Sequence, residues 1–293
     1  MTSAADLLTS AAERLSAAGV PSPRVDAELL LAHVLDVSRA SVRFAGDPSV
    51  EQMAAYDELV SRRAERVPLQ HLTGVSYFRH IELAVGPGVF VPRPETESLA
   101  GWAIDSAAAL AAPVVVDLCT GSGAIAASVA DEVPSAQVHA VELDRDAVSY
   151  AERNLARSGV DLRCGDVADA FPDLDGTVDV VVANPPYIPL EAYESVAAEA
   201  RDHDPDLALW SGEDGLDTIR VIERVAYRLL RAGGVVGVEH ADVQGESAPE
   251  VFAAAGRWSD VRDNPDLAGR PRYLTARRSS AEPASDAQQH MAR

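Results

Sequence analysis

The sequence has few of the features that mark secreted, metal-binding or membrane proteins. It contains only two cysteines, Cys119 and Cys164, too few for a disulfide scaffold and without partners at metal-ligand spacing. We expect both to be reduced thiols and, since the histidines also lack ligand spacing, we predict no metal site. No stretch approaches the roughly 20 consecutive apolar residues that a membrane span needs. The opening stretch MTSAADLLTSAAERLS shows no secretion signal, so we expect a cytoplasmic protein without membrane contact.

Basic residues are scarce as well. The chain has 25 Lys and Arg against 46 Asp and Glu, a formal net charge of -21. Nucleic-acid affinity comes largely from Lys and Arg that neutralise phosphates, so this balance disfavours a direct nucleic-acid partner. A local basic patch around Arg62, Arg63 and Arg66 is the alternative that the net charge leaves open.

The first part of the chain has a helical pattern, from about residue 4 to 66. In RVDAELLLAHVL the apolar positions form one stripe of an amphipathic helix, at Ala27, Leu30, Leu31, Val34 and Leu35. Pro21 and Pro23 interrupt the chain just before it. This pattern predicts a small helical bundle, which we assign to residues 1–75.

Turn-forming residues follow the helical part. Short β-rich pieces, 77–85 and 89–91, surround Gly86-Pro87-Gly88, a strong turn signal. We therefore predict a β-hairpin linker over residues 76–95. After it an alanine-rich helix is expected, running to about residue 111.

From residue 113 onward, strand and helix patterns alternate. The expected strands are 114–118, 138–143, 161–166, 178–184 and 234–240, and the expected helices are 123–132, 145–158 and 215–232. Valine-rich strands alternating with helices predict a parallel sheet covered on both faces, with ligands beyond the carboxyl ends of its strands. The fold class is therefore α/β, with a Rossmann-like sheet over residues 96–278. We expect a strand pair at 258–278 and a disordered tail at 279–293.

Glycines and carboxylates lie at the ends of the first three of these strands. The first strand runs into DLCTGSG (117–123), where glycines allow a tight turn and the following helix presents free N–H groups. The second ends in Glu142, at a distance that suits a carboxylate binding both ribose hydroxyls of a nucleotide. At the end of the third, Asp166 or the next N–H is expected to meet an adenine edge. The alternative is that the loop is only a tight strand–helix connection.

The loop is similar to the D-x-G-x-G-x-G loop of S-adenosylmethionine-dependent methyltransferases. It lacks the full G-x-G-x-x-G spacing of a dinucleotide site, so a nicotinamide cofactor is the weaker choice. Cys119 stands where the methyltransferases usually have their first glycine. A cysteine still permits the fold there if its φ is negative, and nothing nearby in sequence would lower its pKa.

The fourth expected strand stops on Asn184-Pro185-Pro186-Tyr187. Proline cannot donate to a sheet ladder and fixes φ, so the strand should end in a rigid tip. There the Asn184 side-chain oxygen and the Pro185 carbonyl can accept hydrogen bonds from one NH2 group. Tyr187 would add a flat face or a hydroxyl for a planar substrate. Such an arrangement suits methyl transfer to a poorly nucleophilic amide or aromatic amine, whereas the alternative is a strand cap without chemistry.

The order of several motifs narrows the choice. The segments QHLTG (70–74), VPRPETE (91–97), the loop from 117 to 126, NPPYI (184–188) and DPDLAL (204–209) with the glycines at 212 and 215 occur in this order. Together they resemble the release factor glutamine methyltransferase family over roughly residues 24–275. The resemblance implies a class I methyltransferase sheet, a docking N-terminal domain and a hairpin linker. It also implies methylation of the glutamine in the Gly-Gly-Gln motif of class I peptide chain release factors, which modulates translation termination.

The resemblance also implies site residues. The cofactor, S-adenosyl-L-methionine with S-adenosyl-L-homocysteine as product, would be bound by Cys119, Thr120, Gly121, Ser122, Gly123, Glu142, Asp166, Val167 and Asn184. Substrate positions would be Asn184, Pro185, Pro186 and Tyr187, with Arg93 and Glu97 either shaping the glutamine pocket or only starting a helix. The catalytic residues would be Asn184, Pro185 and Tyr187, and we expect a monomer. Two alternatives remain: a nucleic-acid base methyltransferase, and a non-catalytic interaction protein with the same fold.

Overall fold

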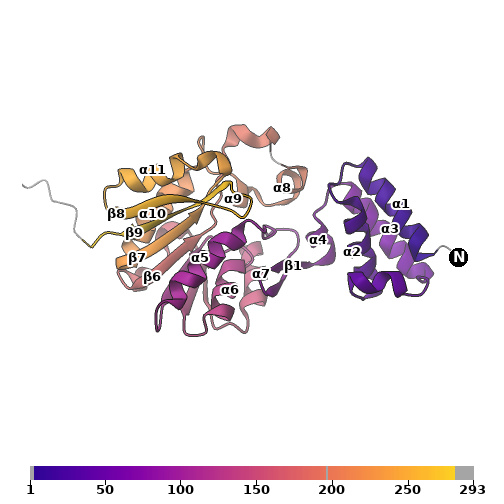
Figure 1. The fold of residues 1–293 in the computed structure, drawn as a ribbon, viewed down its shortest axis with the longest axis horizontal. Helices are drawn as coiled ribbons and strands as arrows, with labels where there is room; N and C mark the ends of the chain where they lie inside the picture. The colour runs from indigo at the N-terminus through magenta and orange to yellow at the C-terminus, as the bar shows by residue number, and fades with distance from the viewer. Residues whose placement is uncertain (1–2, 196, 281–293) are drawn as a thin grey trace, which may run out of the picture. The chain divides into compact units, whose positions relative to one another are not determined.

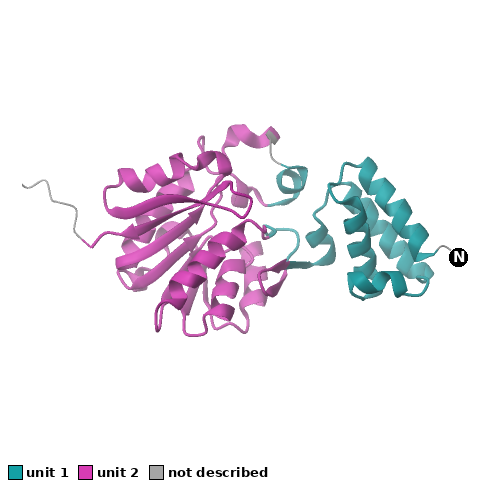
Figure 2. Ribbon diagram, in the orientation of Figure 1, with its two compact units in different colours: residues 1–76, 85–91, 195–204 teal, residues 77–84, 92–194, 205–293 magenta. Residues whose placement is uncertain are grey.

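The chain forms two compact units in a computed structural model that describes residues 3–195 and 197–280. A helical unit comprises Met1–Ser76, Val85–Val91 and Ser195–Asp204. A sheet unit comprises Tyr77–Ala84, Pro92–Glu194 and Pro205–Arg293 (Figure 2). Since the tail predicted at 279–293 lies almost wholly outside the described residues, its disorder stays a prediction.

The helical unit is a bundle with its own apolar core. Its helices are α1 (Ala4–Ala17), α2 (Pro23–Leu35), η1 (Arg39–Phe44), α3 (Val50–Ala64), α4 (Leu69–Thr73) and α8 (Ala198–His203). On α2 the predicted stripe holds, because Ala27, Leu30 and Leu31 are fully buried and the last two members pack at the edge of the core. Serines cap α1 and α3, where Ser3 and Ser49 each accept a backbone N–H in a capping box.

Buried charge pairs tie three helices of this unit together. Arg63 on α3 is only 5% exposed and donates to Asp26 of α2 at 2.8 Å. Arg66 donates to both carboxylate oxygens of Glu199 on α8, at 2.8 and 2.6 Å, and Arg63 contacts the same carboxylate at 3.2 Å. The basic patch considered from the sequence is therefore wrong for Arg63 and Arg66, because acidic partners neutralise both side chains.

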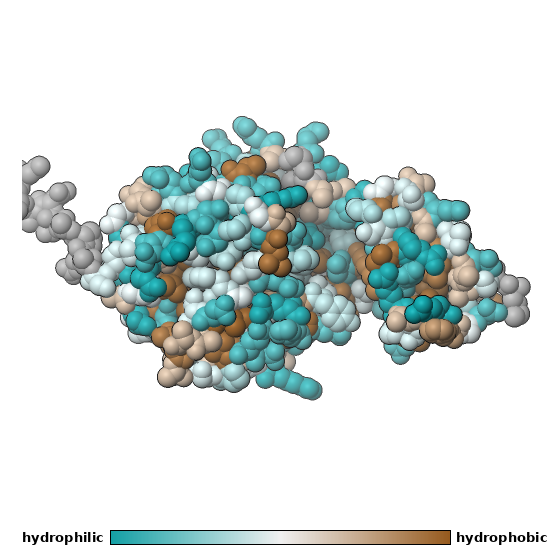
Figure 3. Space-filling view, viewed as in Figure 1, coloured by the Kyte–Doolittle hydropathy of each residue, from teal (hydrophilic) through white to brown (hydrophobic). Residues whose placement is uncertain are grey.

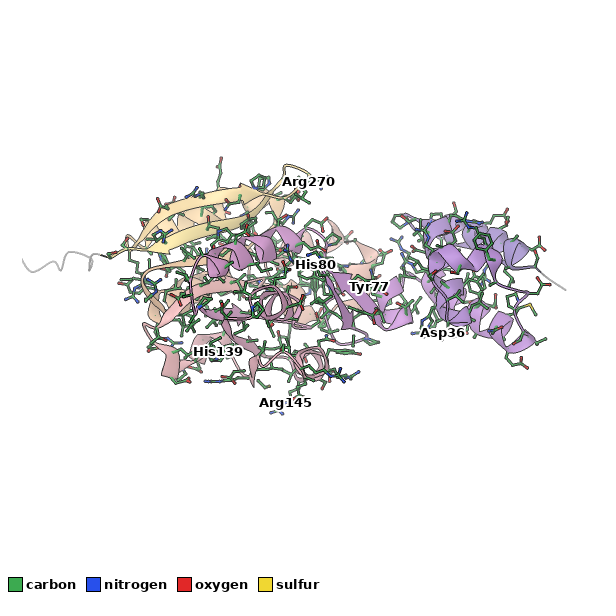
Figure 4. All side chains as sticks on the ribbon, turned by 60° about the horizontal axis from the view of Figure 1, so that its bottom comes forward. Asp36, Tyr77, His80, His139, Arg145 and Arg270 are labelled. Carbon is green, nitrogen blue, oxygen red and sulfur yellow. The ribbon has the colours of Figure 1, made fainter. Side chains whose placement is uncertain are left out.

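A two-stranded sheet follows, formed by β1 (Val75–Phe78) and β2 (Ile81–Ala84). The hairpin is present, but its turn lies at Arg79 and His80 rather than at the predicted Gly86-Pro87-Gly88. Arg79 takes a left-handed φ of 50°, and its N–H donates to Glu97 at 3.0 Å. Tyr77 and His80 mark this hairpin in Figure 4.

The sheet unit contains the predicted α/β fold. Its strands are β3 (Val114–Leu118), β4 (Gln137–Glu142), β5 (Asp161–Cys164), β6 (Val178–Ala183), β7 (Leu230–Glu239), β8 (Trp258–Pro265) and β9 (Pro271–Arg278). They pair in the order β5-β4-β3-β6-β7-β9-β8. The first five are mutually parallel, whereas β9 is antiparallel to β7 and β8, which confirms the predicted terminal strand pair.

Helices cover both faces of this sheet, as Figure 1 shows. On one face lie α5 (Thr96–Ala108), α6 (Ala124–Glu132) and α7 (Arg145–Leu155), and on the other α10 (Asp217–Leu229) and α11 (Ser247–Ala254). The short elements are η2 (Val167–Asp169), η3 (Pro172–Leu174), η4 (Leu190–Ser195), α9 (Asp206–Leu209) and η5 (Asp242–Gln244). Between the layers the valines of β3 and β6 are almost all fully buried, which explains why these strands read as continuous apolar runs.

The surface is mostly hydrophilic. On the face drawn in Figure 3, apolar residues form small separate groups between polar ones. None of the helices within residues 3–195 and 197–280 has the length and apolar character needed to cross a membrane.

Candidate functional site

Four parallel strands end at the same edge of the sheet unit. Leu118 at the end of β3 is in register with Val141 of β4 and Ala183 of β6, and Glu142 of β4 is in register with Cys164 of β5. The loops that follow these strands therefore emerge side by side. The structure thus brings the predicted loop, the acidic strand end and the Asn184 tip to one edge.

Asp117 organises the loop from within, a role that sequence reasoning did not assign. It is 1% exposed, and its Oδ2 accepts the Thr120 hydroxyl at 2.6 Å and the N–H of Ala126 at 3.1 Å. Burial raises the pKa of Asp117 to about 7, although these two hydrogen bonds act in the opposite direction. The sequence could have indicated this role, because Asp117 lies in a valine-rich strand that is expected to be buried. A buried carboxylate needs hydrogen-bond partners.

Cys119 does not meet the condition set out for it from the sequence. Its φ is +60°, in the left-handed region, and not negative. The loop thus keeps the backbone that a glycine would give, at a cost of about 1–2 kcal/mol for a residue with a side chain. Burial, and then the negative charges of Glu142 and Asp117, raise the pKa of the Cys119 thiol. Its thiolate form is disfavoured, so the geometry gives no support to a reactive cysteine.

The Glu142 carboxylate is fixed by three backbone groups. Its Oε2 accepts the N–H of Gly121 at 2.8 Å, and its Oε1 accepts those of Leu143 and Asp144 at 2.8 and 2.9 Å. Burial raises the pKa of Glu142, and these N–H groups counteract the rise. Because a carboxylate has about four acceptor positions, capacity remains for a hydroxyl group.

Space for a ligand lies beside this carboxylate. A Cβ built on Gly121, which has φ of +58°, would meet no other heavy atom within 4 Å, so the backbone there borders open space. At Gly123 a Cβ would come within 3.1 Å of Leu155, so this glycine serves helix packing. Thr120 and Ser122 are buried, and the Ser122 carbonyl accepts the side chain of Asn154 at 2.8 Å. The loop is therefore held by internal contacts and presents its backbone at Gly121, an arrangement that suits a nucleoside-type cofactor.

The residues after β5 offer a less complete adenine site. The Asp166 side chain is exposed and accepts the N–H of Ala168 at 2.8 Å as a helix cap. Val167 is partly buried and packs against the core. The contact of either residue with adenine stays a prediction.

Contacts within the protein hold part of the tip after β6, whose rigidity stays a prediction. Asn184 donates its Nδ2 to the Thr96 hydroxyl at 3.2 Å, while no residue within 3–195 and 197–280 donates to its Oδ1. Pro185 is buried, and over the same described ranges its carbonyl accepts no hydrogen bond. The Tyr187 hydroxyl donates to Glu239 Oε1 at 3.2 Å, so this hydroxyl belongs to the protein and only the ring remains for a substrate.

A second layer holds the tip in place, and the sequence did not reveal it. Gln244 donates its Nε2 to the carbonyl of Tyr187 at 3.1 Å and to that of Asp214 at 3.2 Å. A Cβ on Gly215 would lie 2.3 Å from the Tyr187 carbonyl, so only glycine fits. Next to it Ile188 pairs with 209–211 through backbone hydrogen bonds of 2.9 and 3.0 Å.

The two residues proposed for a glutamine pocket take different positions. The Glu97 carboxylate holds the hairpin turn, which favours the helix-start reading for this residue. Arg93 is partly buried, and its charge lowers the pKa of Tyr187, whereas burial and the charge of Glu239 raise that pKa more strongly. Arg93 thus lies within electrostatic reach of the tip.

His240 follows the end of β7. Its side chain is fully buried, with Nε2 3.0 Å from Asp263. It is part of the sheet interior.

Comparisons with known proteins agree with this geometry. Residues 6–74 match the family model described as PrmC N-terminal domain, and residues 104–200 match that of the methyltransferase small domain. The chain is 59% identical to the release factor glutamine methyltransferase of Streptomyces coelicolor, over 92% of this chain and 96% of that one. It is 48% identical to that of Mycolicibacterium smegmatis, over 95% and 99% of the two chains.

A third relative carries a different name. The 4-amino-L-phenylalanine/4-methylamino-L-phenylalanine methyltransferase of Streptomyces pristinaespiralis is 43% identical, over 90% of this chain and 94% of that one. The fold, the motifs and these identities confirm the predicted family and the S-adenosylmethionine-dependent methyl transfer. The chain belongs to the release factor glutamine methyltransferase family.

Proposed function

We propose that this enzyme methylates the side-chain nitrogen of the glutamine in the Gly-Gly-Gln motif of class I peptide chain release factors. It would thereby modulate translation termination in the cytoplasm. The observation that carries the proposal is a pair of acceptors at the tip, Asn184 Oδ1 and the Pro185 carbonyl, which accept no hydrogen bond from the described residues. They stand at the same sheet edge as the loop and Glu142, where a methyl donor fits.

The two acceptors answer the chemical difficulty of an amide. Its nitrogen is a poor nucleophile because its lone pair is delocalised into the carbonyl. Two fixed oxygens that accept both N–H hydrogens aim the nitrogen and stabilise the positive charge that develops on it. S-adenosylmethionine, when bound, supplies a methyl group on a sulfonium.

The residues of this chain act by orientation and not by strong acid–base chemistry. A carbon–nitrogen bond forms as a carbon–sulfur bond breaks, and the nitrogen proton leaves to water. The Tyr187 ring packs against the planar amide, and Glu142 with the backbone of Gly121 holds the donor. Because an aromatic amine presents the same NH2 group, the tip alone does not separate a peptide glutamine from 4-aminophenylalanine.

The test is a comparison of acceptors with methyl-labelled S-adenosylmethionine. We expect the purified enzyme to label a class I release factor and to leave its Gln→Ala variant unlabelled. DNA, RNA and free 4-amino-L-phenylalanine are the competing acceptors, and none should be labelled at a comparable rate. Preferential labelling of any of these three would overturn the proposed substrate.

A further inference from the structure

A buried carboxyl group adjoins the tip and takes no part in the steps above. Glu239 ends β7, is 1% exposed, and keeps its Oε2 buried without a hydrogen-bond partner in the described part of the chain. Burying an unpaired carboxylate is costly. A buried carboxylate can orient neighbouring side chains by accepting their hydrogen bonds. The residues around Glu239 therefore indicate its role.

Those neighbours link Glu239 to Asn184. The Tyr187 hydroxyl donates to Glu239 Oε1 at 3.2 Å, and a hydrogen bond from the Thr96 side chain lowers the pKa of the same carboxyl. Thr96 is 4% exposed and its Oγ1 accepts Asn184 Nδ2 at 3.2 Å. Hydrogen bonds therefore join Asn184 to Thr96 and Tyr187 to Glu239, and Thr96 lies close enough to the Glu239 carboxyl to affect its pKa.

The direction of these hydrogen bonds follows from counting hydrogens. An ionised carboxylate only accepts, and Glu239 Oε2 has no donor among the described residues, so we assign the single hydroxyl hydrogen of Thr96 to this oxygen. The Thr96 oxygen can then only accept from Asn184, which turns the NH2 of the carboxamide toward Thr96. Asn184 Oδ1 consequently faces the other way, the orientation that binding a substrate NH2 requires. Without Thr96 and Glu239, the two orientations of the amide would be close in energy.

We propose that Thr96 and Glu239 are positioning residues that set the orientation of the Asn184 carboxamide and hold the Tyr187 ring. The inference rests on the proposed function, since it concerns which atom of Asn184 meets the substrate. Neither residue touches the reacting atoms; both act through the tip.

The protonation state of Glu239 should therefore control the tip. The groups that face its carboxyl are Tyr187 after β6, Thr96 and Glu95 at the start of α5, and Arg272 on β9. Burial raises the pKa of Glu239 to about 7, with Thr96, Arg272 and Tyr187 lowering it and Glu95 raising it. Once protonated, Glu239 can donate to Thr96. The Thr96 hydrogen is then released toward Asn184 and favours the reversed amide.

The first experiment compares isosteric variants with release factor as acceptor. We expect Thr96→Val, which keeps the shape and removes the hydroxyl, to lower kcat by about tenfold to a hundredfold, the scale of a misoriented reacting group. Thr96→Ser should recover most of the turnover. Glu223→Gln is the matched control. That residue is a buried carboxylate of α10 held by Arg257 and Trp258, and its substitution should leave kcat within about twofold, as expected away from the site.

A double-mutant cycle tests whether the effect passes through Asn184. In an Asn184→Ala background there is no carboxamide to orient, so Thr96→Val should lower kcat further by less than about twofold. The cofactor Kd should stay near the wild-type value in all variants. An equal loss in both backgrounds would overturn the inference.

The pH profile supplies a readout that a merely structural role would not move. The wild type should lose kcat as pH falls through about 7, and Glu239→Gln should have a lower kcat without this acidic limb. Either an unchanged acidic limb or an unchanged kcat in Glu239→Gln would overturn the role of Glu239. If instead the wild type fails to label the release factor, the proposed function fails first, so the two failures are distinguishable.

Discussion

In the function proposed above, Asn184 carries the largest share of the chemistry in a single side chain. Its NH2 donates to Thr96 within the protein, which would leave its oxygen for the substrate. A partly buried carboxamide with one end fixed has little freedom to turn. The proposed specificity for an NH2 acceptor rests on this oriented oxygen together with the Pro185 carbonyl.

Removing this side chain should therefore affect turnover much more than binding of the donor. We predict that Asn184→Ala lowers kcat by about a hundredfold or more, the typical loss when one transition-state hydrogen bond is removed. Asn264→Ala, which removes another partly buried asparagine bonded to β9, is the control and should keep its kcat. Turnover of the two variants is measured as the rate of release factor labelling, and donor binding as the cofactor Kd from calorimetry. A near-normal rate in Asn184→Ala would refute the acceptor role.

Cys119 offers a test of backbone strain. With φ at +60°, a β-branched side chain is poorly tolerated, so Cys119→Val should lower the free energy of unfolding by about 1–2 kcal/mol. Cys119→Gly should not destabilise, because glycine adopts this conformation freely. Urea unfolding of the three proteins is the measurement. Equal stability of the Val and Gly variants would contradict the assigned conformation.

At this scale the sequence predicted the residues that belong to motifs and missed those that support them. Asn184, Tyr187 and Glu142 stand in recognisable local patterns at strand ends. Thr96 is 88 positions from Asn184, and Glu239 is 52 positions from Tyr187. The local sequence does not predict such pairs, because only the folded chain brings these residues together.

Among the elements, strands were predicted more accurately than the turn between β1 and β2. The apolar runs of β3 and β6 are long and buried on both faces, so their pattern is unambiguous. The hairpin turn was placed at Gly86-Pro87-Gly88 on composition. The structure uses Arg79 instead, held by Glu97 and by an ion pair of 2.6 Å with Glu132. Tertiary contacts from α5 and α6 thus override the local turn signal.

The pairing of α2 with α3 should depend on one buried ion pair. We predict that Asp26→Ala lowers the free energy of unfolding by about 3–5 kcal/mol, because it leaves Arg63 buried with one carboxylate fewer. Asp57→Ala breaks the exposed pair with Arg14 and should cost at most about 1 kcal/mol. Chemical denaturation of the full chain compares the two. Similar losses of unfolding free energy in the two variants would contradict the burial of the Asp26–Arg63 pair.

For the whole molecule, two buried carboxyl groups should make stability depend on pH. Burial raises the pKa of Asp117 from 3.8 and that of Glu239 from 4.5, in both cases to about 7. The folded state therefore binds more protons than the unfolded chain between about pH 4 and 7. The stability that these two groups contribute is fully present below their unfolded-state pKa values, 3.8 and 4.5. This contribution is lost as pH rises through about 7, the pKa of both groups in the folded state.

Neutral replacements should remove this dependence. We predict that Glu239→Gln gains stability relative to the wild type as pH is raised from 5 to 8, and that Asp117→Asn does the same. Thermal unfolding of the wild type and the two variants across this pH range is the measurement. A constant difference between Glu239→Gln and the wild type would contradict the raised pKa.

The ion pairs of Glu199 have a consequence for any attempt to divide the protein. Residues 195–204 lie between the Asn184 tip and α9 in the chain, yet they belong to the helical unit. A fragment that starts after residue 92 would contain α8 but lack Arg63 and Arg66. The Glu199 carboxylate, which lies in the segment that follows the tip, would then lose both of these arginine partners. Exchanging the N-terminal bundle between family members would likewise require transplanting this distant helix with it.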